Sequence, residues 1–283
     1  MKQMIVLPAL ALAGTLLATD LAAQPRVSPP AAVEQTVGIS KISIHYSRPS
    51  VRGRKIFGEL VPWGKVWRTG ANEATTFEIS HDAKINGQPL KAGKYALFTI
   101  PNPESWTVIF NTVPDQWGAF NHEPEKDALR IEVKSEKAPH QESLWIGFPA
   151  FTADSATVAI HWADVRVSFD VAFDNETILL EAARAAVAAG TDPRAPYTWA
   201  QYFYNNDMHL DAALSWAEQA AAASDIYWTH ALKARLLAKH GRHADAVAAA
   251  EHALTVIDGS PSAEFAARDA ERLREEIKGW QGS

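Results

Sequence analysis

Residues 165–190 read VRVSFDVAFDNETILLEAARAAVAAG, and two different patterns meet inside this stretch. Up to Phe173 apolar and polar side chains alternate, which is typical of a half-buried β-strand. After Asp174 the residues become rich in Ala, Glu and Leu, a composition that favours an α-helix. The sequence therefore predicts an α+β chain with two segregated domains, an all-β domain over residues 37–173 and an all-α domain over residues 175–283.

The all-β domain is predicted from a series of short runs with strand-like patterns. Turn signals separate these runs, and Asn86-Gly87 is the strongest hairpin signal among them. Because the sequence between them shows no helical pattern, we expect an antiparallel β-sandwich or barrel and not a parallel sheet with crossover helices. The expected strands cover residues 39–46, 75–80, 94–100, 106–111, 129–133, 144–148, 157–162 and 165–173.

The all-α domain carries an internal repeat of mostly small residues. Asn175 is expected to cap a first helix that ends at Gly190, and a last helix is expected over residues 263–280. Between them, equivalent residues recur with an offset of 33 positions. This offset is close to the roughly 34-residue period of tetratricopeptide repeats, so we expect TPR-like helix pairs, with an alanine-rich helical bundle as the alternative. The equivalent residues are Tyr204 and Leu237, Ala213 and Ala246, Ala217 and Ala250, and Ala220 and Ala253.

The N-terminus has the features of an export signal. Residues 1–23 combine the basic Lys2, an apolar stretch over residues 4–18 and a small-residue cleavage site before Gln24. The apolar stretch is shorter than the roughly 20 residues that span a bilayer, so we expect no membrane span after cleavage. Residues 24–36 contain three prolines and are expected to form a linker. The sequence thus predicts a periplasmic or secreted protein.

The composition excludes several classes of function. The net charge is −6, which gives no basic surface for nucleic acid. Cysteine is absent, so disulfides, thiolate metal sites and cysteine nucleophiles are excluded. The sequence also lacks a nucleophile elbow, a Walker loop and a dinucleotide fingerprint. We therefore predict no cofactor.

The densest polar cluster of the β domain predicts a ligand site. Residues 67–73 read WRTGANE, and the glycine allows the chain to turn tightly among Arg, Asn and Glu side chains that offer many hydrogen bonds. Arg52 and Arg54 add positive charge that favours a carboxylate or phosphate. The alternative is a structural Arg–Glu pair with an asparagine that stabilises the turn. The predicted ligand-binding residues are Arg48, Trp67, Arg68, Asn72, Glu73 and Trp117, the last as an exposed stacking surface.

The same residues carry a family resemblance. YSRPSVRGRKIFGELVPWGKVWRTGANEATTFEIS at residues 46–80, LKAGKYALFTIP at 90–101, WTVIFN at 106–111 and the Trp-Gly pair at 117–118 resemble the DUF2911 family of exported bacterial proteins. The resemblance covers about residues 37–173 and implies the β domain and its export. It implies no activity, because the function of that family is unknown.

A metal site is not predicted. Residues 121–127, NHEPEKD, offer a histidine and acids that could ligate Ca²⁺ or a transition metal, but they lack the order of a calcium loop and the spacing of a zincin helix. We expect an acidic surface loop there. His45, His81 and His161 occur singly near strands and are expected to be core or edge residues.

Three functions remain open from the sequence. The first is a binding module for a small polar or carbohydrate-like ligand, with a helical tail that recruits a protein partner. The second is a carbohydrate-active hydrolase or lyase that uses Glu73, with Asp82 or Glu78 as its second carboxylate. The third is a structural scaffold of the cell envelope.

Overall fold

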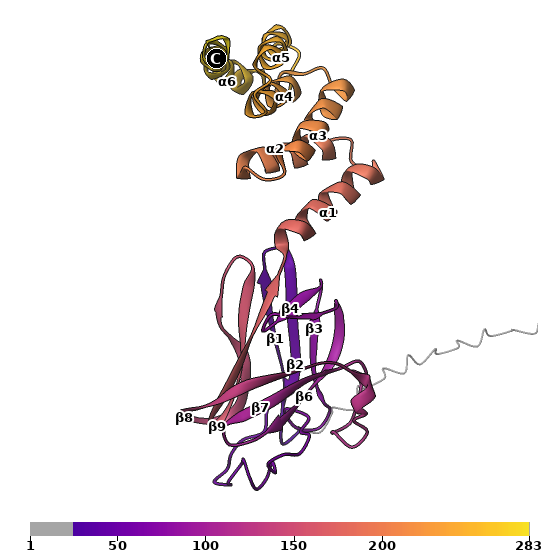
Figure 1. Cartoon of the computed structure of the whole chain (residues 1–283), viewed down its shortest axis with the longest axis vertical. Coiled ribbons are helices and arrows are strands. Elements are labelled where there is room, and N and C mark those ends of the chain that lie inside the picture. The colour runs from indigo at the N-terminus through magenta and orange to yellow at the C-terminus, as the bar shows by residue number, and fades with distance from the viewer. Residues whose placement is uncertain (1–24, 283) are drawn as a thin grey trace, which may run out of the picture. The chain divides into compact units, whose positions relative to one another are not determined.

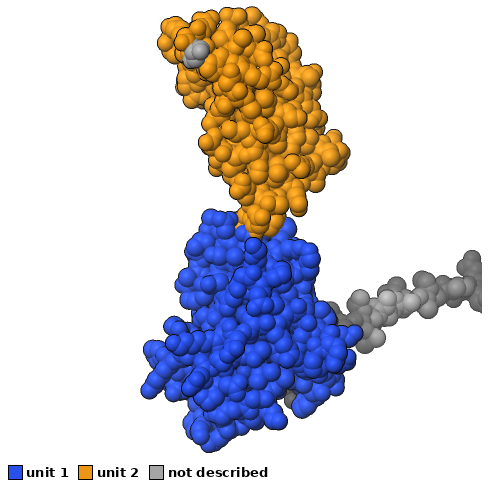
Figure 2. All heavy atoms as spheres, in the orientation of Figure 1, with its two compact units in different colours: residues 1–173 blue, residues 174–283 orange. Residues whose placement is uncertain are grey.

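The computed structural model describes residues 25–282, which form two compact units (Figures 1 and 2). The first unit ends at Phe173 and the second begins at Asp174, where the sequence changes its pattern. The predicted signal peptide lies outside the described residues. No helix within residues 25–282 is both long enough and apolar enough to cross a membrane.

The described part of the first unit is an antiparallel sheet with the strand order β1-β2-β3-β6-β7-β8-β9-β4-β5. The end strands β1 and β5 do not pair with each other, so the sheet is open and folds into a sandwich. The strands are β1 Pro30–Val37, β2 Ser40–Ser47, β3 Thr75–Ile79, β4 Ala83–Ile85, β5 Gln88–Leu90, β6 Gly93–Pro101, β7 Ser105–Asn111, β8 Asp127–Phe151 and β9 Ser155–Phe173.

Strand β8 belongs to both layers of the sandwich. Its first part, through Lys134, pairs with β7, and from Ser135 onward it pairs with β9. The register of the β8–β9 pair shifts on both sides of Gln141, which faces Ala163. Ala163 has a φ of 54° and lies inside β9, so the two strands expected over residues 157–162 and 165–173 are one long strand with a bulge between them. This irregularity bends the hairpin of β8 and β9 without ending either strand.

Aromatic side chains fill the space between the layers. Phe77 and Phe110 from one layer contact Phe169 of β9, with ring centroids 6.1 Å and 5.7 Å away. Each fully buried side chain of this size contributes about 1.5–3 kcal/mol to stability. A second aromatic group surrounds Trp67 and contains Phe57, Trp106 and Trp162.

Two short-range predictions have different outcomes. The Asn86-Gly87 hairpin is confirmed, because it connects the paired strands β4 and β5 and both residues have positive φ. The predicted linker is wrong over residues 30–36, which form most of β1 and pair with β2. The prolines suggested a linker, but β1 is an edge strand, where a missing backbone N–H is tolerated.

The end of β2 and the residues that follow it, together residues 46–51, lie along the part of β8 that has left β7. The Tyr46 hydroxyl donates to the Ile146 carbonyl oxygen at 3.2 Å and accepts from the Ile146 N–H at 3.1 Å. Farther along, the Val51 N–H donates to the Glu142 carbonyl oxygen at 2.7 Å. The 46–51 segment therefore supplies the hydrogen bonds that this edge of β8 would otherwise lack.

The described second unit consists of helices that pack in sequence order. They are α1 Asn175–Ala189, α2 Ala195–Asn206, α3 Leu210–Ala223, α4 Tyr227–Lys239, α5 His243–Thr255 and α6 Ala263–Gln281. The six alanines of the predicted repeat are buried, with exposed fractions of 0–4%. Small side chains at these positions allow consecutive helices to approach closely. The assignment of these pairs as TPR-like stays a prediction.

Caps and ion pairs hold the ends of the helical unit. The cap of α1 is Asp174 and not Asn175, because its Oδ1 accepts from the Thr177 N–H at 3.1 Å. Gly190 ends α1 in the left-handed conformation, as expected. Near the other end, the Nε of Arg235 on α4 donates to Glu276 of α6 at 2.8 Å.

We predict that Tyr46→Phe destabilises the β unit by about 1–3 kcal/mol, because it leaves the buried N–H and carbonyl of Ile146 without their partner. Urea unfolding should measure this loss. Tyr95→Phe is the control, since the Tyr95 hydroxyl bonds only the nearby Lys91 carbonyl at 2.8 Å. An equal loss in both variants would contradict the role given to Tyr46.

Candidate functional site

The loop that leads into β3 contains most of the predicted site residues, and close backbone contacts hold it in place. Trp67 exchanges backbone hydrogen bonds with Thr99 of β6, at 2.7 Å and 2.9 Å. A Cβ at Gly70 would lie 3.0 Å from the Ser47 carbonyl oxygen, so the loop needs glycine there. The Asn72 amide donates to the Ser28 carbonyl and to the Ser47 hydroxyl, each at 3.2 Å. Asn72 therefore connects the loop to the N-terminal segment and to β2.

Trp67 is a core residue. Only 8% of it is exposed, and its ring stacks on Trp162 at 5.8 Å with an interplanar angle of 18°. Its indole N–H donates to the Gly70 carbonyl oxygen at 3.0 Å. Trp67 thus packs in the core against its own loop, and only a small part of its ring is accessible to a ligand.

The predicted site residues do not form one pocket. Trp67 and Arg68 line a hollow of about 230 Å³, which we call the arginine pocket because Arg52, Arg54 and Arg68 line it. Glu73 lines a second hollow of about 310 Å³ beside β2 and β3, which we call the β2–β3 hollow. The remaining predicted residues, Arg48, Asn72 and Trp117, line neither hollow.

The arginine pocket is positively charged. No acidic side chain of the described chain lines it, and none of its three guanidinium groups has a described carboxylate within ion-pairing distance. The rest of its wall is largely apolar and includes Leu60 and Trp162. The pocket therefore combines cationic side chains with a largely apolar wall, and one described carboxylate lies close to it, that of Glu142, which accepts from the Arg52 backbone N–H at 2.9 Å.

Arg68 and Arg54 differ in how their donors are used. Arg54 donates from Nε to the Val51 carbonyl at 3.0 Å and from Nη2 to the Ser50 carbonyl at 2.5 Å. The Nε of Arg68 is buried and has no hydrogen-bond partner among the described residues. Burial also lowers the pKa of Arg68, although an arginine remains protonated at neutral pH. An unpaired buried donor of this kind costs about 1–3 kcal/mol.

Arg48 forms a hydrogen bond that stabilises the fold. Its Nε donates to the Leu144 carbonyl at 2.9 Å, and the Leu144 N–H donates to the Pro49 carbonyl at 2.9 Å. These bonds continue the pairing of the 46–51 segment with β8. Arg48 therefore stabilises the edge next to the arginine pocket, and its predicted role in ligand binding stays a prediction.

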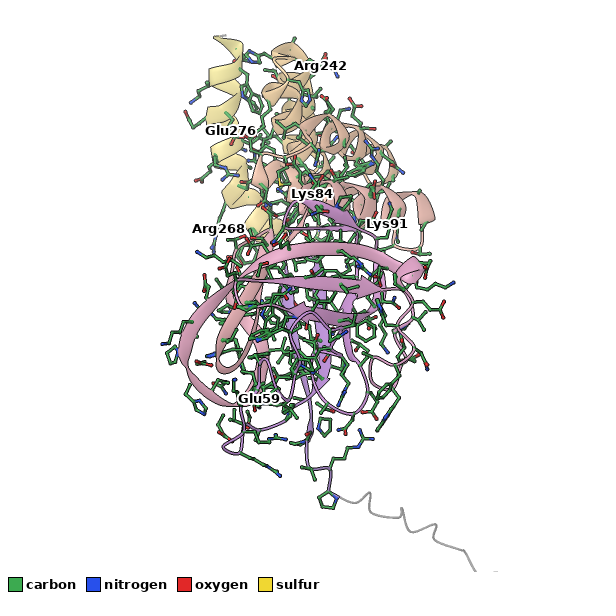
Figure 3. All side chains as sticks on the ribbon, turned by 60° about the horizontal axis from the view of Figure 1, so that its bottom comes forward. Glu59, Lys84, Lys91, Arg242, Arg268 and Glu276 are labelled. Carbon is green, nitrogen blue, oxygen red and sulfur yellow. The ribbon has the colours of Figure 1, made fainter. Side chains whose placement is uncertain are left out.

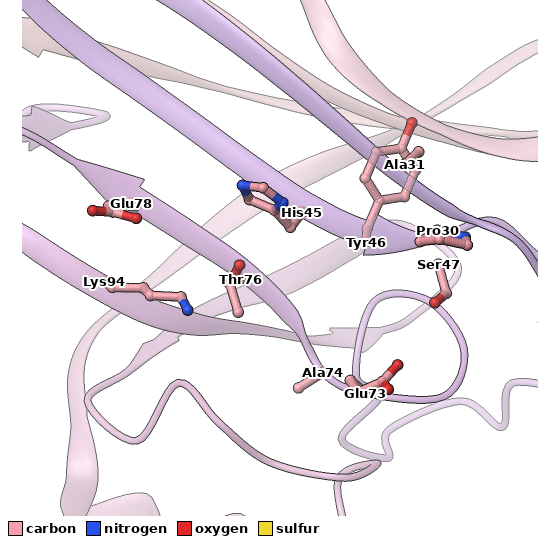
Figure 4. A pocket seen from close by; sticks show the side chains of 10 residues that line it. All are labelled: Pro30, Ala31, His45, Tyr46, Ser47, Glu73, Ala74, Thr76, Glu78 and Lys94. Atoms are coloured by element: carbon pink, nitrogen blue, oxygen red, sulfur yellow. The ribbon is translucent and has the colours of Figure 1, made fainter. Parts of the chain in front are cut away.

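The β2–β3 hollow contains two carboxylates and a histidine. Figure 4 shows Glu73 at one end of this hollow and Glu78 toward the other, with His45 and Thr76 between them. Asp82, the other carboxylate considered with Glu73, does not line it and pairs with Lys91 at 2.7 Å. The hollow thus brings together one of the two carboxylate pairs considered from the sequence.

Glu73 is held in its ionised form. It pairs with Arg26 at 2.7 Å, and both side chains are 49% exposed. A hydrogen bond from its own backbone N–H and a second from Arg26 lower the pKa of the Glu73 carboxyl group. A general acid needs a raised pKa, so this environment suits a base or an anion-holding role better than acid catalysis.

Trp117 is exposed, as the sequence predicted, with an exposed fraction of 61%. It forms a backbone bridge with Glu73 and is followed by Phe120, which is 84% exposed. Its role as a stacking surface stays a prediction.

Residues 121–127 do not form a purely acidic surface loop. The Asp127 side chain is 3% exposed and contacts the His122 Nε2 at 2.9 Å and the Arg130 Nη2 at 2.6 Å. Asn111 also donates to Asp127 at 2.8 Å. The expected surface position is therefore wrong for His122 and Asp127, whose hydrogen bonds join this segment to β7 and the start of β8.

Two further expectations concern single residues. His161 contacts the Pro139 carbonyl at 2.9 Å and His81 contacts the Ser40 hydroxyl at 3.1 Å, so both act as edge residues.

Trp162 was not predicted as a site residue, although it lines the arginine pocket. Its place in a strand was visible in the sequence, but its position beside Trp67 depends on the bend of β8 and β9.

The fold and its pockets define an open antiparallel β-sandwich with a small cationic pocket, followed by a helical unit. Residues 28–171 match the family model described as "Protein of unknown function (DUF2911)", so the chain belongs to this family. The resemblance found in the sequence is thereby confirmed. No match was found among curated proteins or among solved structures.

We predict that Glu73→Gln lowers the free energy of unfolding by less than about 1 kcal/mol at pH 7, because the Arg26–Glu73 pair is half-exposed. The pKa of Glu73 is lower in the folded state, so its contribution is present above its unfolded pKa, about 4.3, and is lost as the pH falls through the folded pKa. Denaturation from pH 7 to pH 3 should show the two proteins converging in acid. Arg26→Gln should remove only part of this contribution, because the hydrogen bond from the Glu73 backbone N–H remains. A stability difference between the unaltered chain and Glu73→Gln that does not shrink in acid would contradict the prediction.

Proposed function

We propose that the β unit is a binding module for a small anionic ligand, held in the arginine pocket. The observation that carries this proposal is the lining of the pocket, which includes three arginines and no acidic side chain. A carboxylate or phosphate accepts bidentate hydrogen bonds from a guanidinium group, so it matches both the charge and the donors of this pocket.

The size of the pocket restricts the ligand. Its volume of about 230 Å³ lies below the usual range of roughly 300–1,000 Å³ for sites of drug-sized ligands. A ligand of this class is therefore a small acid, or the acidic end of a larger molecule whose remainder stays in solvent. The apolar wall beside Trp162 favours a ligand with a short apolar part next to its anionic group. A neutral sugar satisfies neither feature.

A second candidate function rests on the β2–β3 hollow. Glu73, Glu78 and His45 line one hollow, which is the minimum that acid–base chemistry on a carbohydrate needs. We rank it below anion binding, because Arg26 holds Glu73 as a carboxylate. A purely structural role of residues 67–73 ranks third, because it does not explain why Arg68 lines a pocket with two further arginines.

We predict that inorganic phosphate and benzoate stabilise the protein against heat, whereas glucose does not. The Arg68→Gln variant should bind these anions at least about 10-fold more weakly, because one hydrogen bond to a charged group contributes about 1.5–3 kcal/mol. Calorimetric titration at low salt measures the dissociation constants directly.

Arg166→Gln is the matched control for this experiment. Arg166 belongs to the same unit and pairs with Glu136 at 3.0 Å, and it does not line the pocket. It changes the net charge equally, so a general charge effect would weaken binding in both variants. Absence of anion binding, or an equal loss in Arg166→Gln, would overturn the proposal.

For the helical unit we propose protein binding. A largely apolar hollow of about 700 Å³ supports this, because its lining includes Tyr197, Ile226, Trp228 and Pro261. Tyr197 and Trp228 are half-buried and Pro261 is exposed, and aromatic residues are enriched at surfaces that bind proteins.

We also propose that the protein is exported, on the basis of the sequence pattern of residues 1–23. In a bacterial host with a periplasm, cell fractionation should recover the chain outside the cytoplasm, and N-terminal sequencing should begin at Gln24. A chain that keeps Lys2 and stays in the cytoplasmic fraction would contradict export. Replacement of Leu10 by Arg should block export without changing the mature protein.

A further inference from the structure

Asp225, His230 and His252 bring three metal-ligand atoms together in the helical unit. The Nε2 atoms of His230 and His252 lie 2.8 Å and 2.7 Å from the same Asp225 Oδ1. All three ligand atoms lie within 4.8 Å of one another, and no other group of this kind occurs among the described residues. The two imidazole rings are 4.3 Å apart and nearly perpendicular.

Three different parts of the chain position this cluster. Asp225 lies in the connection between α3 and α4, His230 in the first turns of α4, and His252 near the end of α5. Helices α4 and α5 pack against each other through buried alanines, among them Ala231 and Ala250. The separation of the two histidines is therefore set by helix packing and not by a flexible loop.

The donor set matches a divalent transition metal. Imidazole nitrogen with a carboxylate oxygen suits Zn²⁺, Co²⁺, Ni²⁺ and Cu²⁺, and sites that keep an open position often use three protein ligands. Ligand atoms around such an ion are about 3.0–3.4 Å apart, given bond lengths of about 2.1 Å. The observed distances of 2.7 Å and 2.8 Å to Asp225 need to lengthen by only a few tenths of an ångström.

The cluster also opens onto a hollow. His230 and His252 line a space of about 400 Å³ together with Lys233 and Arg242, the latter labelled in Figure 3. An ion held by the three side chains would keep coordination positions directed to this space, where water or an anion can bind. Glu218 and Asp245 also line this space and pair with Arg242 at 3.6 Å and 2.7 Å, so the charges around it are largely balanced.

We propose that Asp225, His230 and His252 form a three-ligand site for a divalent transition metal with its open positions facing this hollow. The proposal is independent of the arginine pocket, because the two sites lie in different units and share no residue. The competing explanation is a hydrogen-bonded cluster in which two histidines donate to one surface carboxylate. The two explanations differ in their response to metal.

The test uses the purified chain without a histidine tag, stripped of metal with a chelator. Calorimetric titration with Zn²⁺ should give one site per chain, and titration with Co²⁺ should give the visible absorption bands of a nitrogen- and oxygen-ligated ion. His252→Ala and Asp225→Asn should each weaken Zn²⁺ binding at least about 10-fold, the order of loss seen when metal-site contacts are removed. Both side chains are exposed enough, at 47% and 66%, for the variants to keep the fold, which circular dichroism would check.

Asp211→Asn is the matched control. Asp211 contacts only one histidine, His240, at 3.0 Å, and belongs to the same unit. This variant removes an exposed carboxylate that contacts a single histidine and lies outside the proposed site. It should therefore bind Zn²⁺ as tightly as the unaltered chain. Absence of stoichiometric Zn²⁺ binding, unchanged affinity in His252→Ala, or an equal loss in Asp211→Asn would each overturn the proposal.

Discussion

The β unit depends on how one exposed edge of β8 is covered. Strand β8 leaves β7 after Lys134 and would present free backbone groups from there onward. Such an edge favours aggregation unless something pairs with it. The Tyr46 hydroxyl satisfies both backbone groups of Ile146, and the residues that follow continue the contact toward Glu142. The sandwich can therefore be open without leaving this part of its edge exposed.

The same segment creates the candidate ligand pocket. After it pairs with β8, the chain turns at Arg52 and Gly53, both with positive φ, and this turn brings Arg52 and Arg54 to the pocket that Arg68 also lines. The pairing of residues 46–51 with β8 therefore holds the guanidinium groups of Arg52, Arg54 and Arg68 around one pocket, although like charges repel one another. Because Arg54 bonds backbone carbonyls of its own segment, its position is fixed before any ligand binds. A pocket arranged in this way loses little conformational freedom on binding.

Features that depend on residues close together in the sequence were predicted correctly. Features that depend on the pairing of strands far apart in the sequence were not. The change at Asp174, the Asn86-Gly87 hairpin and the buried alanines are local patterns, and all three were predicted correctly. The lengths of β8 and β9 were not, because a bulge at Ala163 looks like a turn until its partner strand is known. For the site, the arginines and Trp67 were recognised as a cluster, but their separation from Glu73 into another hollow follows from tertiary packing alone.

Hydrogen-bond satisfaction separates the structural polar groups of this protein from its candidate sites. Asn72 was predicted as a ligand-binding residue, yet it donates to Ser28 and Ser47. Asp127 was expected in a surface loop, yet it is buried and contacts His122 and Arg130. The Arg68 Nε is buried without such a partner, and Asp225 places one oxygen between two imidazoles that a cation could share. Trp106 Nε1, Gln116 Oε1 and His209 Nε2 are also buried without a hydrogen-bond partner among the described residues, but of these groups only Arg68 lines the arginine pocket. This criterion favours the arginine pocket over the residues that the sequence made most prominent.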